Sequence, residues 1–341
     1  MDRRRFAAGL AAVAVAPLAA RNAFAQSAVQ ARVGVIPIMG AAPVFVADRE
    51  GWLKEKGLQL AFTTFESGPN MIQALASGTI DIYVAGVAPL AVAKSRGVNI
   101  RVVAATATAE NVLVAGPKLA AHFAPGVAPA AAFKAFRTAQ GKAARLATQP
   151  AGSVPNTTLQ YWLWEVAKAD KADAEVVPMG IDATQQAILA GAVDGAIVRE
   201  PAVTIIGERN PAIKLIATGD ELFPGQPGTV VAVSEAFVSK NNGAVQTLVS
   251  NLVRAEKLLK SDPDRAAPHI AAALGKGIVE PATIKRALGS PATKFVIDPR
   301  AIIEPAKAMQ AYQVKLGSLE KEFPFDGLFD ARYYEAALAG Q

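Results

Sequence analysis

The hydrophobic and polar positions along the chain alternate between short apolar runs and longer stretches with helical spacing. Four apolar runs of strand length come first, at residues 31–36, 58–65, 80–85 and 100–106. The stretches between them carry apolar side chains at helical spacing, at residues 40–56, 69–77 and 89–96. Gly57 and Gly78 stand where the first two of these helices are expected to end. This alternation predicts a mostly parallel β-sheet with helices on both faces.

A second stretch of the chain repeats the same alternation. It predicts strands at residues 144–148, 174–178, 192–198 and 212–217 and helices at residues 155–168 and 183–190. Residues 73–81 align with residues 186–194 at a constant offset of 113, and each copy places one aspartate, Asp81 or Asp194, at the start of a buried strand. The shared pattern of βαβ units explains this likeness as well as a duplication does. On either interpretation, the chain holds two similar α/β modules.

The pattern changes after a dense turn signal. Residues 224–228 read Pro-Gly-Gln-Pro-Gly, and a β-branched run of strand length follows at residues 229–233. From Ser234 onward the spacing predicts helices, at residues 243–260, 263–274, 281–288, 299–317 and 332–339. Several of them begin with a proline, whose fixed φ and missing N–H suit the first turn of a helix. We therefore expect a helical C-terminal part.

The first 25 residues have the pattern of an export signal. Arg3, Arg4 and Arg5 precede an apolar stretch at residues 7–20, and Ala23-Phe24-Ala25 offers a small-x-small cleavage site. The stretch is shorter than the ~20 apolar residues that span a bilayer, which favours a cleaved signal over an anchor. The order Arg-Arg-x-Phe resembles a twin-arginine signal, with the general secretory route left open. We expect an exported protein cleaved near Ala25.

Composition narrows the function classes. The chain has no cysteine, which excludes disulfides, thiolate metal sites and cysteine nucleophiles. Its formal net charge is +6, of which the four arginines and one aspartate of the leader supply +3, leaving +3 for the remaining chain. No block of lysines and arginines with interleaved aromatics remains, which argues against nucleic acid as a partner. A mildly positive field favours anionic ligands.

Several motifs in the two modules resemble one known family. They are Phe65-Glu66-Ser67-Gly68-Pro69-Asn70, residues 74–81, Gly86-Val87-Ala88-Pro89, Gly152-Ser153, and the stretch from Val193-Asp194 to Glu200-Pro201. Together with the export leader they make the chain similar to the periplasmic substrate-binding proteins of ABC importers for sulfonates, taurine, nitrate and thiamine precursors. Relatives often carry an aromatic residue where this chain has Arg199. The resemblance therefore covers the whole mature chain without fixing the ligand.

The resemblance implies an α/β, two-lobed periplasmic binding protein fold with two hinge crossings, each lobe a mostly parallel sheet flanked by helices. After the signal peptide at residues 1–25, lobe I would comprise residues 26–113 plus 229–341 and lobe II residues 114–228. The crossings would fall near residues 112–116 and 229–233. The implied function is capture of a small molecule between the lobes, in the periplasm, and its delivery to a membrane permease. A monomer without a cofactor is expected.

The loops beyond the carboxyl ends of the strands are the expected ligand-binding positions. In open parallel sheets, ligands bind at that edge, where helix N-termini present free N–H groups. These loops supply Met39, Gly40, Ser67, Gly68, Asn70, Gly86, Val87 and Ala88 from the first module and Gly152, Ser153, Asp182, Arg199 and Glu200 from the second. Glycine lets backbone approach an anion closely. Ser67 and Ser153 suit a helix N-cap equally well.

Arg199 and Glu200 form the most specific pair of candidates. They follow a buried apolar strand and precede Pro201, so we expect them to project at the rim of the cleft. An arginine there holds a carboxylate or sulfonate by two parallel N–H bonds, while lobe–lobe or helix-cap contacts are the alternative role. A small anionic organic ligand is predicted, with a sulfonate or taurine type favoured over an aromatic carboxylate or nitrate. Asp81 and Asp194, at the opposite ends of their strands, are expected to be caps.

No catalytic constellation accompanies these loops. His122 and His269 lie far apart in the chain and are expected at the surface, without a partner at metal-ligand spacing. The aromatic residues at 161, 162 and 164 suit packing on one helix. Two other functions stay open, an enzyme on the same fold that acts on a pyrimidine or menaquinone precursor and a ligand-sensing module of a membrane receptor. The leader and the absence of a nucleophile with an adjacent base favour binding over catalysis.

Overall fold

The computed structural model describes residues 28–275, 279–325 and 327–340. The strands of its first five-stranded sheet are, in spatial order, β2 (Leu58–Thr64), β1 (Val29–Val35), β3 (Ile82–Gly86), β11 (Thr229–Ser234) and β4 (Ile100–Ala105). β1 pairs in parallel with β2 and β3, whereas β11 is antiparallel to both of its neighbours. The β-branched run after the turn signal therefore lies inside the first sheet.

The second five-stranded sheet follows the same plan. Its strands are, in the corresponding order, β8 (Ala174–Pro178), β7 (Ala144–Thr148), β9 (Gly195–Val198), β6 (Val112–Ala115) and β10 (Lys214–Ala217). β7 pairs in parallel with β8 and β9, whereas β6 is antiparallel to β9 and β10. Each sheet thus has one antiparallel strand, in the fourth position. The predicted α/β fold with two mostly parallel sheets is confirmed.

A matched contact at the amino ends of the strands supports the equivalence of the two sheets. The Asp81 carboxylate accepts a hydrogen bond from the Arg32 backbone N–H at 2.9 Å, and the Asp194 carboxylate accepts one from the Arg145 backbone N–H at 2.9 Å. In both pairs the two residues are 49 positions apart. Each aspartate satisfies a backbone donor at the start of a strand, which is the capping role that its position predicts.

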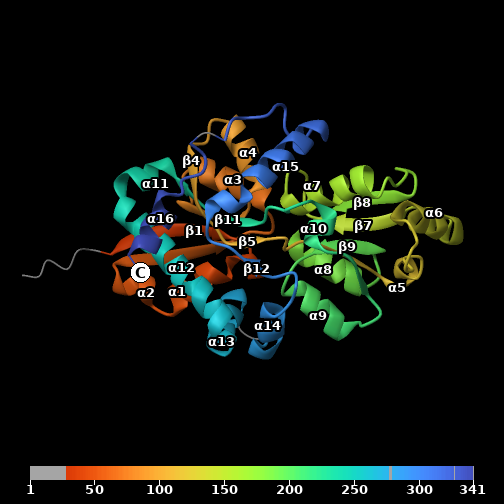
Figure 1. The fold of residues 1–341 in the computed structure, drawn as a ribbon, viewed down its shortest axis with the longest axis horizontal. Coiled ribbons are helices and arrows are strands. Elements are labelled where there is room, and N and C mark those ends of the chain that lie inside the picture. The colour runs from red at the N-terminus through yellow and green to blue at the C-terminus, as the bar shows by residue number, and fades with distance from the viewer. Residues whose placement is uncertain (1–27, 276–278, 326, 341) are drawn as a thin grey trace, which may run out of the picture.

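Helices flank each sheet, and the two groups lie at opposite ends of the long axis (Figure 1). The first unit carries α1 (Ala42–Arg49), α2 (Trp52–Glu55), α3 (Gly68–Ala76), α4 (Ala88–Ser95), α11 (Glu235–Lys240), α12 (Asn242–Ser261), α13 (Pro263–Leu274), α14 (Pro281–Leu288), α15 (Ile303–Lys315) and α16 (Arg332–Ala339). The second unit carries α5 (Pro117–Ala120), α6 (Pro129–Gln140), α7 (Val154–Tyr161), α8 (Ile181–Leu189), α9 (Ala202–Arg209) and α10 (Gly219–Leu222). Three short helical turns, η1 (Met39–Ala41), η2 (Trp162–Val166) and η3 (Pro299–Ile302), complete the helical structure.

Two neighbouring connections join the units. The chain leaves the first sheet after β4 and returns before β11, through residues 106–111 and 218–228. The backbone N–H of Thr106 donates to Thr229 O at 2.8 Å, and that of Ala109 donates to Gln226 O at 2.9 Å. β5 (Ala107–Thr108) on the first connection also pairs with β12 (Lys294–Phe295). The two connections are therefore bonded to each other along their length.

Three differences from the expected elements have local causes. The helix expected at residues 40–56 is broken at Gly51, whose φ of 80° is incompatible with a continuous right-handed helix. The helix expected at residues 155–168 changes to π-type hydrogen bonding from Trp162 to Val166. α6 and α9 were not predicted, because their apolar stripes are narrow: α6 buries an alanine and two phenylalanines, and α9 buries Ile206 alone.

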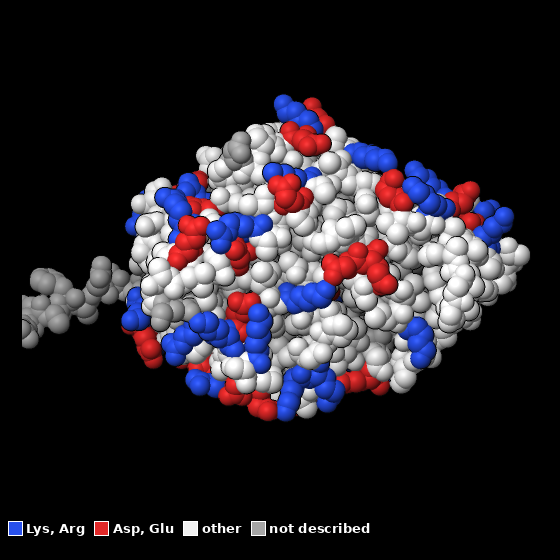
Figure 2. Space-filling view, viewed as in Figure 1, with Lys and Arg blue, Asp and Glu red and all other residues white. Residues whose placement is uncertain are grey.

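Each unit has its own hydrophobic core. Val33, Val84 and Val231 lie in the core of the first unit, and Phe133 and Leu146 lie in that of the second. Lysine, arginine, aspartate and glutamate are interspersed over the face seen in Figure 2, without a large area of one sign. No helix within the described ranges is long and apolar enough to cross a membrane. The predicted signal peptide, residues 1–25, lies outside the described residues.

Candidate functional site

The carboxyl ends of the parallel strands of both sheets face each other across the interface between the two units. Direct backbone contacts cross this interface: Met39 N–H donates to Glu200 O at 2.9 Å, and Ile181 N–H donates to Glu66 O at 3.4 Å. The loops that the sequence selects are therefore brought together from both units. The units are in contact here, as in a closed two-lobed protein.

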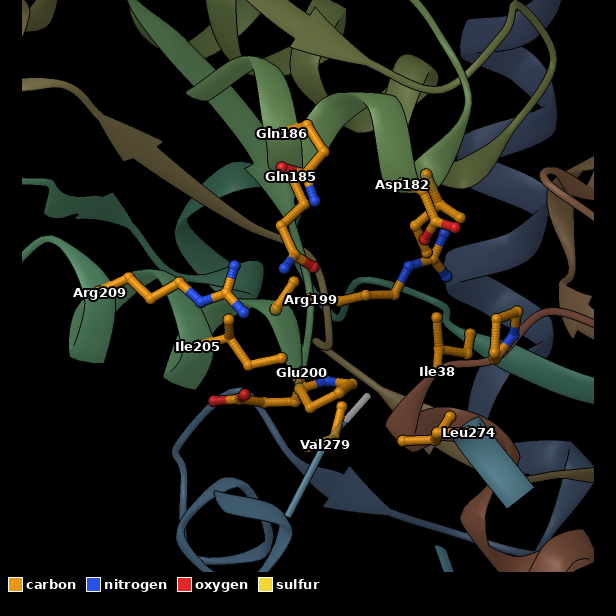
Figure 3. A pocket seen from close by; sticks show the side chains of 14 residues that line it. Ile38, Asp182, Gln185, Gln186, Arg199, Glu200, Ile205, Arg209, Leu274 and Val279 are labelled. Atoms are coloured by element: carbon orange, nitrogen blue, oxygen red, sulfur yellow. The ribbon is translucent and has the colours of Figure 1, made fainter. Parts of the chain in front are cut away.

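A pocket of about 230 Å³ opens at this interface (Figure 3). The second unit supplies the first turns of α8, the end of β9 and the length of α9, and the first unit supplies the loop after β1 and the end of α13. The lining residues are Pro37, Ile38, Ile181, Asp182, Gln185, Gln186, Arg199, Glu200, Pro201, Ala202, Ile205, Arg209, Leu274 and Val279. The pocket is larger than the ~150 Å³ that holds a benzene ring. Polar and apolar groups on opposite walls suit a small organic molecule.

Arg199 lies at the back of this pocket and Glu200 is buried beside it, so the expectation that this pair projects at the rim is wrong. Arg199 is 4% exposed, and its guanidinium donates to Gln149 Oε1 at 2.8 Å and to Glu110 Oε1 at 3.4 Å. The Thr229 hydroxyl donates to the same Glu110 oxygen at 2.7 Å. Burial lowers the pKa of Arg199, and the neighbouring Glu110 carboxylate opposes that shift. Arg199 directly follows β9, at the interface between the units, so its side chain is enclosed rather than exposed.

A second, much smaller hollow of about 10 Å³ lies on the other side of Arg199. It is lined by Ile36, Ser67, Gly68, Gly86, Pro89, Gln149, Ser153, Val154, Pro155 and Arg199. Five predicted positions thus meet here, from both units. A hollow of this size holds about one water molecule. The close contact of Gly86 with Val154 explains why, since a Cβ added at Gly86 would stand 2.8 Å from Val154 Cγ2.

The two predicted serines and Glu200 have helix-capping partners in this arrangement. Ser67 Oγ accepts from the Asn70 N–H at 3.4 Å, and Ser153 Oγ accepts from the Asn156 N–H at 3.3 Å. Glu200 accepts from the backbone N–H and the hydroxyl of Thr204, both at 3.0 Å. Burial raises the pKa of Glu200, and its hydrogen bonds oppose the shift. All three side chains therefore have the helix-capping role that the sequence analysis gave as the alternative to ligand binding.

Of the remaining predicted residues, one lines the larger pocket and the others lie in the loops next to it. Asp182 lines the larger pocket from the first turn of α8. The others, Met39, Gly40, Asn70, Val87, Ala88 and Gly152, line neither hollow. Several of them serve the backbone: Val87 N–H donates to Gly228 O at 3.0 Å, and the Gly152 carbonyl accepts from the Gln313 amide at 3.3 Å. A side chain at Gly40 would collide with Glu110 and Thr229.

Sequence reasoning missed part of the pocket. The missed residues are Ile181, Gln185, Gln186, Ala202, Ile205, Arg209, Leu274 and Val279 in its lining, and Glu110 and Gln149 behind Arg199. Gln185 stands three residues after Asp182 on α8, a spacing that places both on one face and offered a usable signal. Leu274 and Val279 line the pocket because of where the C-terminal helices pack against the rest of the chain. The local sequence pattern does not predict that packing.

The other chemistry-bearing residues singled out by the sequence have packing roles. His269 is partly exposed at the surface, with Nε2 2.9 Å from Glu50 Oε1, and the partly exposed His122 ring stands edge-on to Phe136. Trp162 is buried in the core of the second unit. Tyr161 packs against Phe223 and Tyr312, at ring-centroid distances of 4.6 and 5.1 Å.

Comparison with known proteins identifies the wider group. The model of the NMT1-like family matches residues 25–275. The chain is 26% identical over 231 residues to the nitrate import ATP-binding protein NrtC of Synechococcus elongatus; this match covers 67% of the chain and 35% of that relative. The match therefore spans about a third of the length of this relative.

Solved structures share the fold. The periplasmic nitrate-binding protein NrtA from Synechocystis PCC 6803 aligns with a TM-score of 0.73 at 14% identity, over 92% of this chain and 89% of that one. The alkanesulfonate-binding protein SsuA from Xanthomonas axonopodis pv. citri, bound to MOPS, aligns with a TM-score of 0.70 at 20% identity, over 90% and 100%. Because the identities are only 14% and 20%, these comparisons show a shared fold of two units and do not extend to the ligand.

Proposed function

Because the chain belongs to the NMT1-like family, we propose that it is the solute-binding component of an ABC importer, which carries a small organic molecule to a membrane permease. The observation that carries this proposal is the pocket of about 230 Å³ between two sheets of the same topology. Its walls come from both units, so a bound molecule bonds to both at once. A ligand with that property favours the closed arrangement over the open one.

The proposed mechanism is hinge closure around the ligand. We assign lobe I to residues 28–105 plus 229–340 and lobe II to residues 112–217, with the paired connections at residues 106–111 and 218–228 as the hinge. The crossings expected near residues 112–116 and 229–233 are instead β6 and β11, strands inside the two sheets. Two short connections that absorb a change of φ and ψ are the usual means of such closure. The permease would then distinguish the closed, loaded form from the open one. The protein would act in the periplasm, after removal of its leader.

The ligand that we propose is a small organic anion, with a sulfonate or taurine type favoured. The nitrate-binding and alkanesulfonate-binding names of the structural neighbours support an anion. So does the presence of Arg199 and Arg209 in the pocket lining. The Glu110 carboxylate beside Arg199 removes part of that positive charge, so Arg199 alone does not decide the ligand.

Native mass spectrometry of the freshly purified protein tests the proposal directly. We expect a co-purified small molecule that is lost on denaturation and whose mass identifies its class. Added back at a hundred times its Kd, it should stabilise the fold by ~2.7 kcal/mol, measured as a rise in melting temperature. A protein that neither retains nor is stabilised by any small solute, across sulfonates, carboxylates, nitrate and pyrimidines, would contradict a solute-binding role. A rise with pyrimidines alone would exclude the anion and keep the role.

A further inference from the structure

Arg209 stands in the last turn of α9 and lines the pocket between the units. Its guanidinium reaches toward the middle of the pocket, on the same side as Gln185 (Figure 3). Within the ranges that the structure describes, no carboxylate forms an ion pair with it. A guanidinium offers five N–H donors in a planar fork that matches a carboxylate or sulfonate. Arg209, an exposed residue, therefore brings to the pocket a guanidinium that is not held in an ion pair, although the Asp182 and Glu200 carboxylates line the same pocket.

The neighbouring acidic residue, Glu208, is paired with another arginine. The Glu208 carboxylate accepts from Arg286 Nε at 2.6 Å and from the Thr283 hydroxyl at 3.3 Å. Both partners belong to α14 of the first unit, so this contact crosses the interface and draws Glu208 away from its neighbour. The same contact fixes the last turn of α9 when the units are together. Closure of the units thus fixes the position of Arg209 beside the pocket and leaves its guanidinium free to bond to a ligand.

Arg199 is in the opposite situation. Its guanidinium is enclosed, and Glu110 and Gln149 already occupy two of its N–H directions. A ligand anion at Arg199 would also lie near the Glu110 carboxylate, which repels it. The two arginines of one pocket therefore differ in what they offer a ligand: Arg199 is a paired, buried group, and Arg209 is an open one.

Apolar side chains line the pocket together with Arg209. Ile38 and Val279 of the first unit form the wall across from α9, and Ile205 stands one turn before Arg209 on α9, beside it (Figure 3). Contact with these side chains is favourable for a hydrocarbon part and gives nothing to an inorganic ion such as sulfate. With about 230 Å³ available, the pocket has room for a ligand slightly larger than benzene, which a cavity of ~150 Å³ holds.

We propose that Arg209, assisted by Gln185, binds the anionic group of the ligand, and that Ile38, Ile205 and Val279 contact its short hydrocarbon part. The ligand class is then a carboxylate or sulfonate on a small apolar body, and Arg209 determines the specificity for its charge. This inference rests on the proposed function and refines it, because it assigns the anion to Arg209 instead of Arg199.

Isothermal titration with matched probes tests the assignment. Benzoate and benzenesulfonate supply the anion on a ring, and benzamide is the neutral analogue of benzoate with the same shape. The full mature chain should bind both anions and should bind benzamide at least about 10-fold more weakly, because a hydrogen bond to a charged group contributes more than a neutral one. In Arg209→Gln, the affinity for both anions should fall about 10- to 100-fold, while that for benzamide stays unchanged.

Two further variants separate charge recognition from other effects. Arg96→Gln removes one positive charge at the end of another helix, α4, on an exposed position away from the pocket, and should bind like the unaltered protein. Arg209→Lys keeps the charge without the planar fork and should lie between the two. All variants should melt at the same temperature without ligand. A stabilising role of Arg209 at the C-terminus of α9 would instead lower that temperature and leave the anion preference intact.

The inference is overturned if Arg209→Gln keeps the preference for benzoate over benzamide, or if the unaltered chain shows no such preference. The mass-spectrometric experiment keeps this failure distinct from that of the proposed function. A co-purified solute that Arg209→Gln retains as well as the unaltered protein would refute the role of Arg209 and support solute binding. Absence of any solute and of binding to every probe would refute both.

Discussion

The two sides of the interface between the units are built differently. On one side, α15 of the first unit packs against α7 and the π-type turn of the second: Tyr312 donates to Gln160 O at 3.0 Å, and its ring stands edge-on to Tyr161. On the other side, α8 and α9 stand apart from the loop after β1 and leave the pocket open. In Figure 1, α15 lies above the strands and α9 and α14 lie below them.

This difference shows how one interface can hold the two units together on one side and leave room for a ligand on the other. Large side chains fill the first side, so when the units close its contacts form without a ligand between them. The second side is joined at its mouth by the Glu208–Arg286 pair, and its interior is lined by helix ends that nothing in the described chain covers. The contacts of α15 with α7, the filled side, should therefore determine the free energy of closure. The groups that line the pocket, the hollow side, should determine which ligand is bound.

Replacement of Arg199, which stands between the two sides, should have the largest effect. Arg199→Ala leaves the Glu110 carboxylate buried at 3% exposure without its charged partner. Loss of one partner of a buried pair costs about 3–5 kcal/mol. Urea unfolding should report this loss. Glu110→Gln in the same chain should recover part of it, and a single variant that is as stable as the unaltered protein would show that the pair does not hold the two sides together.

Replacement of Gly86 should affect closure rather than folding. An added methyl would stand 2.8 Å from Val154 Cγ2 of the other unit, so it collides only when the units are closed. Such crowding costs about 1–3 kcal/mol, which corresponds to a roughly 5- to 150-fold loss of ligand affinity. The melting temperature without ligand should barely change if the free protein is open.

Gly195→Ala is the matched control. Its methyl would meet Leu146 Cδ2 at 2.7 Å and the Val114 carbonyl oxygen at 3.0 Å, both within the second unit. That collision is present in open and closed forms alike, so it should lower the melting temperature and leave the affinity of the folded protein unchanged. If both variants behave alike, Gly86 does not report on closure.

Replacement of Gln313 should weaken the filled side to a smaller degree. Its amide donates to the Ala88 carbonyl of the first unit at 3.4 Å and to the Gly152 carbonyl of the second at 3.3 Å, and so bridges the two. Loss of one net hydrogen bond costs about 1 kcal/mol, or roughly a 5-fold weaker affinity. Titration of Gln313→Ala with the co-purified solute measures it. An unchanged affinity would mean that this bridge is not part of closure.

The ion pair between Lys315 and Glu165 should contribute least. It joins α15 to the second unit at an exposed position, where solvent and salt screen the two charges. Lys315→Ala should change ligand affinity by less than about twofold, and the small difference should vanish in high salt. A large, salt-resistant effect would show that the filled side depends on charge instead of on packing.

Local sequence pattern was sufficient for most elements and for the edge at which the site lies. β7, β8, α13, α14 and α16 have the predicted bounds. Their apolar periods, initial prolines and terminal glycines act within a few residues, so they can be read without knowledge of the rest of the chain. The rule that ligands bind beyond the carboxyl ends of parallel strands likewise led to Asp182, Arg199 and the Ser67 and Gly86 loops, all of which line one of the two hollows.

Tertiary structure alone decided what each of these groups does. The sequence placed Arg199 at the end of a strand, but only the packing of Glu110 and Gln149 around it made it a buried, paired group. Arg209 gave no signal in the sequence, and it became a candidate because α14, more than 70 residues later in the chain, takes the Glu208 carboxylate. Burial and charge compensation depend on neighbours that are distant in sequence, and the periodicity of a single element carries no information about them.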